Sequence, residues 1–443
     1  MNCSKREFIC QTMTFSAAAI LSPSILAAAA RANWEVPLWL QKRMYDTALR
    51  IAQRKIRGGP GDPNFKKPFT DAAFSSNIFY WDTCFIATYA KYHLDILPVV
   101  NALDNFYRFQ DADGFICREY TKDGTPFWPK DHPVSTNPPL LAFAELQVYG
   151  ISKDKQRLAS VYPNLKRHYK WLVSAFQAAD GLFISDGLGS GMDNIPRHPD
   201  GWRDDGKGIP LVQLFPNVYN YNSLSASWNR QGRSVDMSAQ MVLFARNMST
   251  ICDIIGHTQD IYDYQALQRS VSKVLNDLCW NDEEGFYYDL AYGKQLKRKH
   301  VGMFWTLLAD VVPARRHSRF LAHLTEKTAF WRVCPVAAFP ADQKFFDPKG
   351  GYWLGGVWAP TNYMVIMGLE RVGRHDLALT LARQYYWCVA EVFKRTGTFW
   401  ENYAPDFVER GAPSASDFCG WTALAPIALW HEYIAAGSTG AKT

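Results

Sequence analysis

The sequence of 443 residues predicts an all-α fold, an (α/α)6 toroid with its long loops at one end. Three observations support this prediction. Apolar residues recur with helical spacing in about twelve segments from Trp34 onward. Two kinds of helical segment alternate along the chain, and the connections between them alternate between short and long. Residues 33–443 are therefore predicted to form a single domain built from six helical hairpins.

One kind of segment is amphipathic, with charged residues on one face at helical period. The stretch LQKRMYDTALRIAQRKI, residues 40–56, is an example. A helix with one apolar face packs on that face alone, so these segments are predicted to form the outer layer. They lie near residues 35–56, 96–110, 155–177, 259–279, 313–327 and 374–394.

The other kind of segment is apolar or small on nearly every side, as in PPLLAFAELQVYG and WTALAPIALWHEY. A helix that is apolar all round is buried all round, so these segments are predicted to form the inner layer. They lie near residues 80–94, 138–151, 233–255, 297–311, 359–373 and 418–437.

The links from each inner helix to the next outer helix are short, whereas the links from outer to inner helices are long. All the long links must then emerge at one end, where the inner helices begin. We expect the functional face at that end, with short strands or turns around its mouth. The long links are 57–79, 111–137, 178–232, 280–296, 328–358 and 395–417.

The first 32 residues are predicted to be a secretory signal peptide. A short basic start precedes an apolar, alanine-rich stretch, and Ala30-Arg31-Ala32 forms a cleavage pattern. The stretch SKREFI also resembles a twin-arginine signal, with Lys5 in place of the first arginine. Ser22-Pro23 interrupts the apolar stretch, so no stable membrane span is expected. The protein is predicted to be exported, either to the periplasm or out of the cell.

The composition argues against several other functions. The net charge is +6, but no basic block stands out, so no nucleic-acid partner is expected. There is no GxGxxG, P-loop, GxSxG or HExxH motif and no zinc-type spacing, so neither a cofactor nor a metal is expected. The scattered cysteines outside the signal are interpreted as buried free thiols. Nothing in the sequence indicates an oligomeric state.

Acidic residues in the long links suggest hydrolytic chemistry. Asp193 stands in GSGMDNIPR and Glu401 in FWENYAPD. Two carboxylates across a cleft are what glycoside hydrolysis needs, one to protonate the leaving oxygen and one to act on the opposite side. Met192 and Ile195 would shield Asp193 from water and favour its protonated form. The alternative is that Asp193 is a turn residue, which is the commoner role of an aspartate in a loop.

Other residues of the predicted functional face could bind a small carbohydrate. Asp82 and Asp236 each lie near the start of an inner helix, where they could hold sugar hydroxyls or cap the helix. Aromatic residues make up 15% of the chain, and they could stack on sugars or fill the core. The further candidates for substrate contact are Tyr80, Trp81, Asn137, Arg197, Arg233, Trp353, Trp358, Trp400, Tyr403 and Trp421.

Seven stretches, in order, resemble the successive motifs of trehalase-like six-hairpin glycosidases. They are SNIFYWDTCF, STNPPL, GSGMDN, RSVDMSAQ, YWLGGVWAPTNY, WENYAP and CGWTAL. The nearest group is glycoside hydrolase family 63 with the mannosylglycerate and glucosylglycerate hydrolases. The resemblance implies that Asp193 is the general acid and Glu401 the general base of an inverting mechanism. It also implies that Asp82, with Trp81 beside it, binds substrate.

The resemblance has one clear departure, because relatives often show WRGPxW where this chain has Trp353-Leu354-Gly355-Gly356-Val357-Trp358. Leu354 replaces an arginine and Gly356 a proline, so the substrate is the least certain inference. Two classes of function remain at this point. One is an exo-acting hydrolase of α-linked glucosides or mannosides, such as oligosaccharides or glycosylglycerates. The other is a non-hydrolytic carbohydrate-binding protein, or a lyase or epimerase on the same scaffold.

Overall fold

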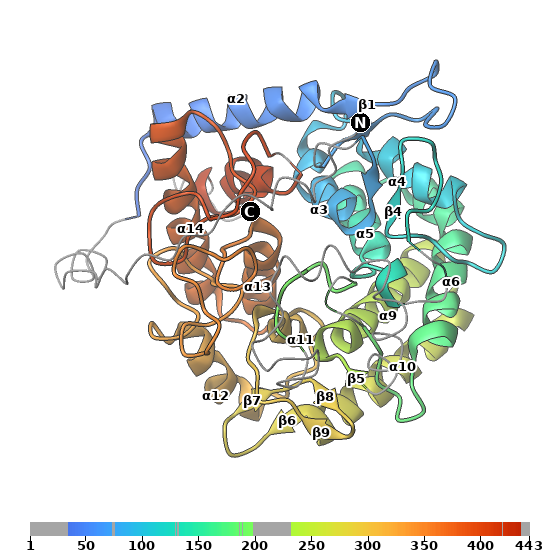
Figure 1. Ribbon diagram of the computed structural model, residues 1–443. Coiled ribbons are helices and arrows are strands. Elements are labelled where there is room, and N and C mark those ends of the chain that lie inside the picture. Colours follow the sequence, from blue (N-terminus) through green and yellow to red (C-terminus); the bar gives the residue numbers. More distant parts are fainter. Residues whose placement is uncertain are drawn as a thin grey trace.

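The computed structural model shows a helix-rich molecule (Figure 1). It describes residues 34–435 apart from 73–75, 129, 131–132, 186, 188, 198–231 and 419. The predicted signal peptide lies outside the described residues. Within the described part of the chain, no helix is long and apolar enough to cross a membrane. The six described cysteines are free and buried, as predicted from their scattered, apolar settings.

The predicted outer segments are helices that bury one face. In α2, for example, Leu40, Met44, Ala48 and Ile51 are buried at helical spacing. The outer helices are α2 (Leu38–Arg54), α4 (Val99–Arg108), α6 (Lys155–Phe176), α10 (Ile261–Val274), α12 (Ala314–Thr325) and α14 (His375–Thr396). A π-helical turn, η5 (Leu275–Cys279), extends α10.

The predicted inner segments are largely buried: every residue of α3 is buried, while α5, α9 and α13 expose residues near their C-terminal ends. The inner helices are α3 (Tyr80–Ala90), α5 (Leu141–Ser152), α9 (Val235–Ile255), α11 (Trp305–Leu308), α13 (Ala359–Arg371) and the π-helix η8 (Ala425–Ile434). The 3-10 helices η6 (Val301–Phe304) and η7 (Thr422–Leu424) precede α11 and η8. Further 3-10 turns are η2 (Lys91–His93), η3 (Pro133–Ser135) and η4 (Thr258–Asp260).

Consecutive inner helices contact one another around a ring. Contacts run from α3 to α5, α9, α11 and α13, then to η7, and both η7 and η8 return to α3. Each of the outer helices α4, α6, α10 and α14 packs on an inner neighbour, and α2 packs against both α14 and η8. Helices therefore surround a centre, and elements from the two ends of the described chain lie side by side (Figure 1).

Short antiparallel strands lie in or at the edges of the long links, where some pairs join two links and others form within one link. They are β1 (Ile56–Arg57), β2 (Phe69–Thr70), β3 (Ile78–Phe79), β4 (Glu119–Tyr120), β5 (Gly232–Arg233), β6 (Trp280–Asn281), β7 (Phe286–Tyr287), β8 (Leu290–Ala291) and β9 (Lys294–Gln295). The pairings are β1 with β2, β3 with β4, β6 with β7, and β5–β8–β9. A bridge between Val357 and Tyr403 joins the last two long links. Pairing between successive links is expected if they share one end of the ring.

Candidate active site

The turn that carries Asp193 is built from small residues. The Ser190 hydroxyl donates to the Gly187 carbonyl at 2.7 Å and accepts from the Met192 amide at 3.1 Å. Gly191 has φ +77°, and a Cβ there would lie 2.5 Å from the Trp81 indole. Only glycine permits both this backbone angle and this close approach. The run of small residues therefore allows Trp81 to pack directly on the turn.

Two asparagines tie the same turn to neighbouring links. Buried Asn194 accepts from the Trp353 amide and donates to the Gly351 carbonyl, both at 2.9 Å. Asn137 donates to the Gly189 carbonyl at 3.3 Å. Asn194 thus fixes the residue next to Asp193 to the link that contains Trp353. The sequence analysis proposed Asn137 but missed Asn194, although its place directly after Asp193 was a usable signal.

Glu401 is held between backbone contacts and a tyrosine. Its amide donates to the Ala415 carbonyl at 2.9 Å, and the Trp421 indole donates to the Glu401 carbonyl at 3.1 Å. The Tyr352 hydroxyl donates to Glu401 Oε1 at 3.3 Å. The carboxylate of Glu401 is therefore oriented by Tyr352, which the sequence analysis did not select.

The phenol of Tyr352 lies within electrostatic range of three predicted carboxylates. Burial raises the pKa of Tyr352 well above its ordinary value, and the charges of Glu401, Asp193 and Asp82 raise it further. Asp82 lies buried in the first turn of α3, and Asp193 is half-buried. Of the three, Glu401 contacts the phenol directly.

Four of the predicted tryptophans form a continuous cluster beside these carboxylates. The rings of Trp353 and Trp358 stack with centroids 4.0 Å apart and an interplanar angle of 3°. Trp421 lies 5.6 Å from Trp358 and 5.7 Å from Trp81, and Trp81 lies 6.2 Å from Trp353. Because Trp81 also touches the Asp193 turn and Trp421 also bonds to Glu401, the cluster connects the two candidate catalytic residues.

Two aromatic candidates pack toward the outer layer instead. The Tyr80 ring lies 5.4 Å from that of Phe106 in α4 and is fully buried. Tyr403 lies 6.5 Å from Tyr385 of the outer helix α14. Both rings therefore have aromatic partners in the outer layer.

Two further candidates are partly buried and contact charged residues. The half-buried Trp400 ring lies under the Arg410 guanidinium, 4.6 Å from its central carbon. Arg233, on β5, pairs with Asp180 at 2.6 Å. Neither contact places these side chains among the three carboxylates.

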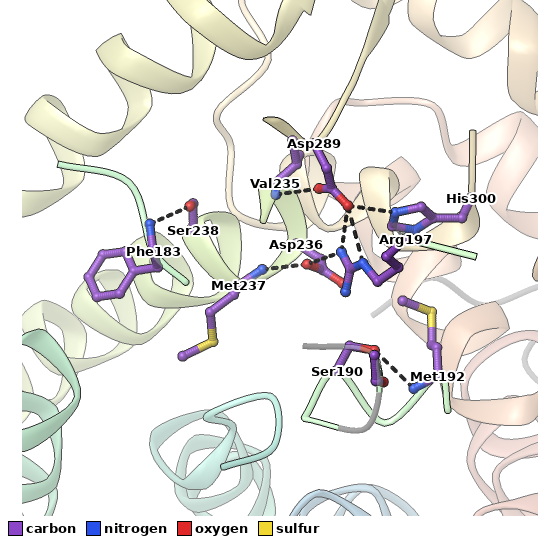
Figure 2. Close-up of polar contacts among 11 residues, drawn as sticks. Phe183, Ser190, Met192, Arg197, Val235, Asp236, Met237, Ser238, Asp289 and His300 are labelled. Atoms are coloured by element: carbon purple, nitrogen blue, oxygen red, sulfur yellow. Dashed lines mark hydrogen bonds and ion pairs between the residues drawn. The ribbon is translucent and has the colours of Figure 1, made fainter. Parts of the chain in front are cut away.

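Arg197 and Asp236, two of the candidates for substrate contact, form an ion pair with each other at 2.7 Å (Figure 2). Arg197 also donates to Asp289 Oδ2 through two nitrogens, at 3.1 and 2.9 Å. The same oxygen lies 3.2 Å from His300 Nε2, while Asp289 Oδ1 accepts from the Val235 amide. Burial acts to raise the pKa of Asp289, but the Arg197 charge and the His300 hydrogen bond lower it below its ordinary value.

Asp289 and His300 were missed by the sequence analysis. Asp289 lies in the long link 280–296, and His300 lies just before η6. Their position on the predicted functional face was the only available signal. We call Arg197, Asp236, Asp289 and His300 the arginine cluster.

Carboxylates that lie close together can transfer protons and activate water. The tryptophans beside them are buried, with Trp353 and Trp358 0% exposed and Trp81 and Trp421 4% and 3% exposed. Within the described residues, no group of three or more His, Cys, Asp or Glu side chains could hold a metal ion. The fold and the site thus define a helical protein with carboxylates suited to acid–base chemistry.

Comparison with known proteins agrees with this class. Residues 75–422 match the mannosylglycerate hydrolase MGH1-like glycoside hydrolase domain. A probable mannosyl-oligosaccharide glucosidase of Schizosaccharomyces pombe is 21% identical over 74% of this chain, which spans 40% of that protein. An uncharacterized protein of Borreliella burgdorferi is 24% identical over 83% of this chain and 70% of its own length.

A solved structure also shares the fold. It is a GH63 mannosylglycerate hydrolase of Thermus thermophilus in complex with glucose. Its TM-score is 0.70 at 22% identity, covering 88% of this chain and 99% of that chain. The chain belongs to the mannosylglycerate hydrolase MGH1-like glycoside hydrolase family. It is accordingly a glycosidase that hydrolyses O-glycosyl bonds, which decides against the non-hydrolytic, lyase and epimerase alternatives.

Proposed function

We propose that the protein is an inverting, exo-acting glycoside hydrolase that cleaves α-linked glucosides or mannosides. Residues 33–443 form one catalytic domain, and the ring of inner helices belongs to an (α/α)6 toroid. The observation that carries this proposal is the tryptophan cluster that joins the Asp193 turn, through Trp81, to Glu401, through Trp421. The Tyr352 phenol donates to Glu401 and lies within electrostatic range of Asp193 and Asp82.

In the proposed reaction, Asp193 donates its proton to the glycosidic oxygen as the bond from that oxygen to the anomeric carbon breaks. Glu401 takes a proton from a water molecule, whose oxygen attacks the anomeric carbon from the opposite face. An inverting enzyme needs about 6.5–9.5 Å between the two carboxyl groups to leave room for this water. Asp82 holds sugar hydroxyls. No cofactor takes part in these steps.

The names of the relatives support the proposed substrate class. They include a mannosylglycerate hydrolase and a mannosyl-oligosaccharide glucosidase, and one related structure contains glucose. An α-linked oligosaccharide or a glycosylglycerate-like compound fits all of these. Leu354 carries no charge where relatives often have an arginine, so a neutral aglycone is included among the candidates.

We also propose that the protein is exported and that residues 1–32 are removed. The support is the basic start, the apolar stretch and the Ala30-Arg31-Ala32 pattern. Mass spectrometry of the protein recovered from the periplasm or medium should give a first residue at Asn33. Recovery there of a chain that still begins at Met1 would contradict the cleavage.

The catalytic proposal is tested by screening α-linked disaccharides and glycosylglycerates for sugar release. The anomeric form of the fresh product is then followed by NMR. An α-glycoside should release the β-anomer, because the mechanism inverts. Asp193→Asn and Glu401→Gln should each lower turnover by at least about 10²-fold, since each removes a positioned proton transfer. Release of the α-anomer would overturn inversion, and full activity in Glu401→Gln would overturn the assignment of the base.

A further inference from the structure

The arginine cluster is the second anchor of the Asp193 turn. Arg197 lies four residues after Asp193 and reaches across to α9 and the link before β8. Its side chain is only 5% exposed, and its partners Asp236 and Asp289 are 1% and 9% exposed. A guanidinium buried against two carboxylates has a fixed direction, because any other orientation would leave buried charges without partners. The backbone at Arg197 is therefore held in place.

Met192, on the other side of Asp193, lies near the same cluster. A Cβ added to Gly302 would lie 2.8 Å from Met192 Cε, 2.8 Å from His300 Nδ1 and 3.0 Å from Asp236 Oδ2. The Met192 methyl group and two members of the arginine cluster therefore all border Gly302 (Figure 2). Asp193 thus lies between Arg197, a member of the cluster, and Met192, which lies beside it.

The opposite side of the turn is tied to the half of the site that contains Glu401. Asn194 bonds to Gly351 and Trp353, on either side of the Tyr352 that donates to Glu401. The arginine cluster on one side and Asn194 on the other therefore determine how far Asp193 stands from Glu401. This separation sets the geometry of the reaction.

We propose that Arg197 is a positioning residue for the general acid, held by Asp289 and Asp236, with His300 as a further partner of Asp289. This inference rests on the proposed function, because it needs Asp193 to be the acid. Proton donation depends on placement, and a displacement of about 1 Å can cost about 10²-fold in rate. Arg197 does not touch the sugar in this proposal. It acts by fixing the turn that presents Asp193.

The shape of the arginine side chain, as well as its charge, is required. Arg197 donates from Nε and one terminal nitrogen to Asp289, and from that terminal nitrogen also to Asp236. A lysine keeps the charge but has a single flexible nitrogen and cannot reproduce this fork. Arg197→Lys should therefore leave the cluster charged and the chain folded while loosening the turn.

The test compares two substrates that differ in their need for an acid. An alkyl α-glycoside needs protonation of its leaving oxygen, whereas the matching α-glycosyl fluoride releases fluoride with little help from an acid. In Arg197→Lys, kcat for the alkyl glycoside should fall by about 10²-fold, and kcat for the fluoride should stay within about threefold. KM for both should change little, because no sugar contact is removed.

Three further variants keep the result interpretable. Asp289→Asn retains the shape of the carboxylate but weakens its hold on Arg197, so it should show the same substrate selectivity. Glu401→Gln should slow both substrates, because water attack is needed in both reactions. Arg157→Lys is the matched control, since Arg157 has a side chain only 12% exposed and also pairs with two carboxylates, Glu145 and Asp104, at 2.7 and 2.9 Å. It should leave the ratio of the two rates unchanged.

Equal losses on both substrates in Arg197→Lys would overturn the proposal, because they would indicate general damage to the site. Unchanged rates on both substrates would also overturn it. If Arg197→Lys does not fold, the rates of Asp289→Asn on the two substrates provide the test. Equal losses or unchanged rates in that variant would overturn the proposal in the same way. Failure of the unmodified protein to hydrolyse either substrate would instead contradict the proposed function.

Discussion

At the scale of single residues, Gly191 determines how closely Trp81 approaches the turn that carries Asp193. Its φ of +77° lies in the left-handed region, and a Cβ would overlap the Trp81 indole at 2.5 Å. A side chain at this position must displace either the indole or the turn. Both the indole and the turn are parts of the candidate active site. The backbone conformation at Gly191 therefore affects the geometry of the site, as the Asp193 carboxylate does.

Gly191→Ala should lower kcat by at least about 10²-fold, because a shift of about 1 Å in a catalytic group has that effect. The matched control is Gly373→Ala. Gly373 has φ +73°, nearly the same backbone angle, but no atom lies within 4 Å of its added Cβ. Steady-state kinetics of both variants, with melting temperatures, separate the steric effect from backbone strain. Equal activity losses in the two variants would show that contact with Trp81 is not responsible.

The residues that could be predicted from the sequence are those whose type already suggests chemistry. Asp193, Glu401 and Asp82 stand in links or helix starts that the helical pattern places at one end. Asp289 could not be predicted, because its role comes from an ion pair with Arg197, 92 residues earlier in the chain, and His300 takes part through its contact with Asp289. No local pattern specifies such a pairing.

Tyr80 shows a second limit of residue-level prediction. It directly precedes Trp81 and Asp82, but successive residues on a helix point about 100° apart. Its ring therefore faces Phe106 in the outer layer while Trp81 faces the tryptophan cluster. The motif that contains Tyr80, Trp81 and Asp82 therefore does not predict toward which side of α3 each side chain points.

At the scale of elements, the helices follow the periodicity of the sequence closely, because burial on one face or on all faces leaves different patterns. The segment predicted as a helix over residues 297–311 is the exception, since it contains only η6 and the single turn α11. Asp310 adopts φ +60°, which ends the helix, and Pro313 follows. The periodicity of apolar residues in the sequence reveals neither a left-handed residue such as Asp310 nor the π-helical geometry of η8.

His168 on α6 gives a prediction about acid stability. Its ring is buried, its Nδ1 lies 3.1 Å from the Gly114 carbonyl, and burial lowers its pKa to about 4. An unfolded chain has an ordinary histidine pKa of about 6.5. Between about pH 6.5 and pH 4 the unfolded state therefore binds a proton that the folded state does not. The free energy of unfolding should fall across this range by up to about 3 kcal/mol from this residue alone.

Urea unfolding of the protein and of His168→Gln at several pH values measures this contribution. The variant should be less stable at pH 7 but should lose less stability between pH 6.5 and pH 4. The control is Trp171→Phe. Trp171 stacks on His168, so its replacement disturbs the same packing without removing a group that titrates. Identical pH dependence in His168→Gln and Trp171→Phe would contradict the assignment to the imidazole.

At the scale of the whole molecule, the ring of helices is closed by elements from the two ends of the described chain. The helix α2 packs against α14 and η8, and the Trp430 indole of η8 donates to Gln41 of α2 at 3.0 Å. The Tyr45 hydroxyl of α2 lies 2.7 Å from His93 Nε2 and 2.8 Å from His431 Nε2. One phenol therefore joins α2 to the end of the first inner helix and to the last inner helix. These contacts lie near the C-terminal ends of the inner helices, away from the long links.

Tyr45→Phe should lower the free energy of unfolding by about 1–2 kcal/mol, because two imidazoles lose a hydrogen-bond partner while the ring packing is kept. Burial raises the pKa of Tyr45 to about 12, so the hydroxyl stays protonated and the effect should be constant from pH 7 to 9. Tyr262→Phe is the control, since Tyr262 is 74% exposed. Glycosidase activity should be unchanged in both variants, because the Asp193 turn and the tryptophan cluster lie at the other end of the inner helices. If Tyr45→Phe destabilises the protein no more than Tyr262→Phe does, this hydroxyl does not contribute to closing the ring.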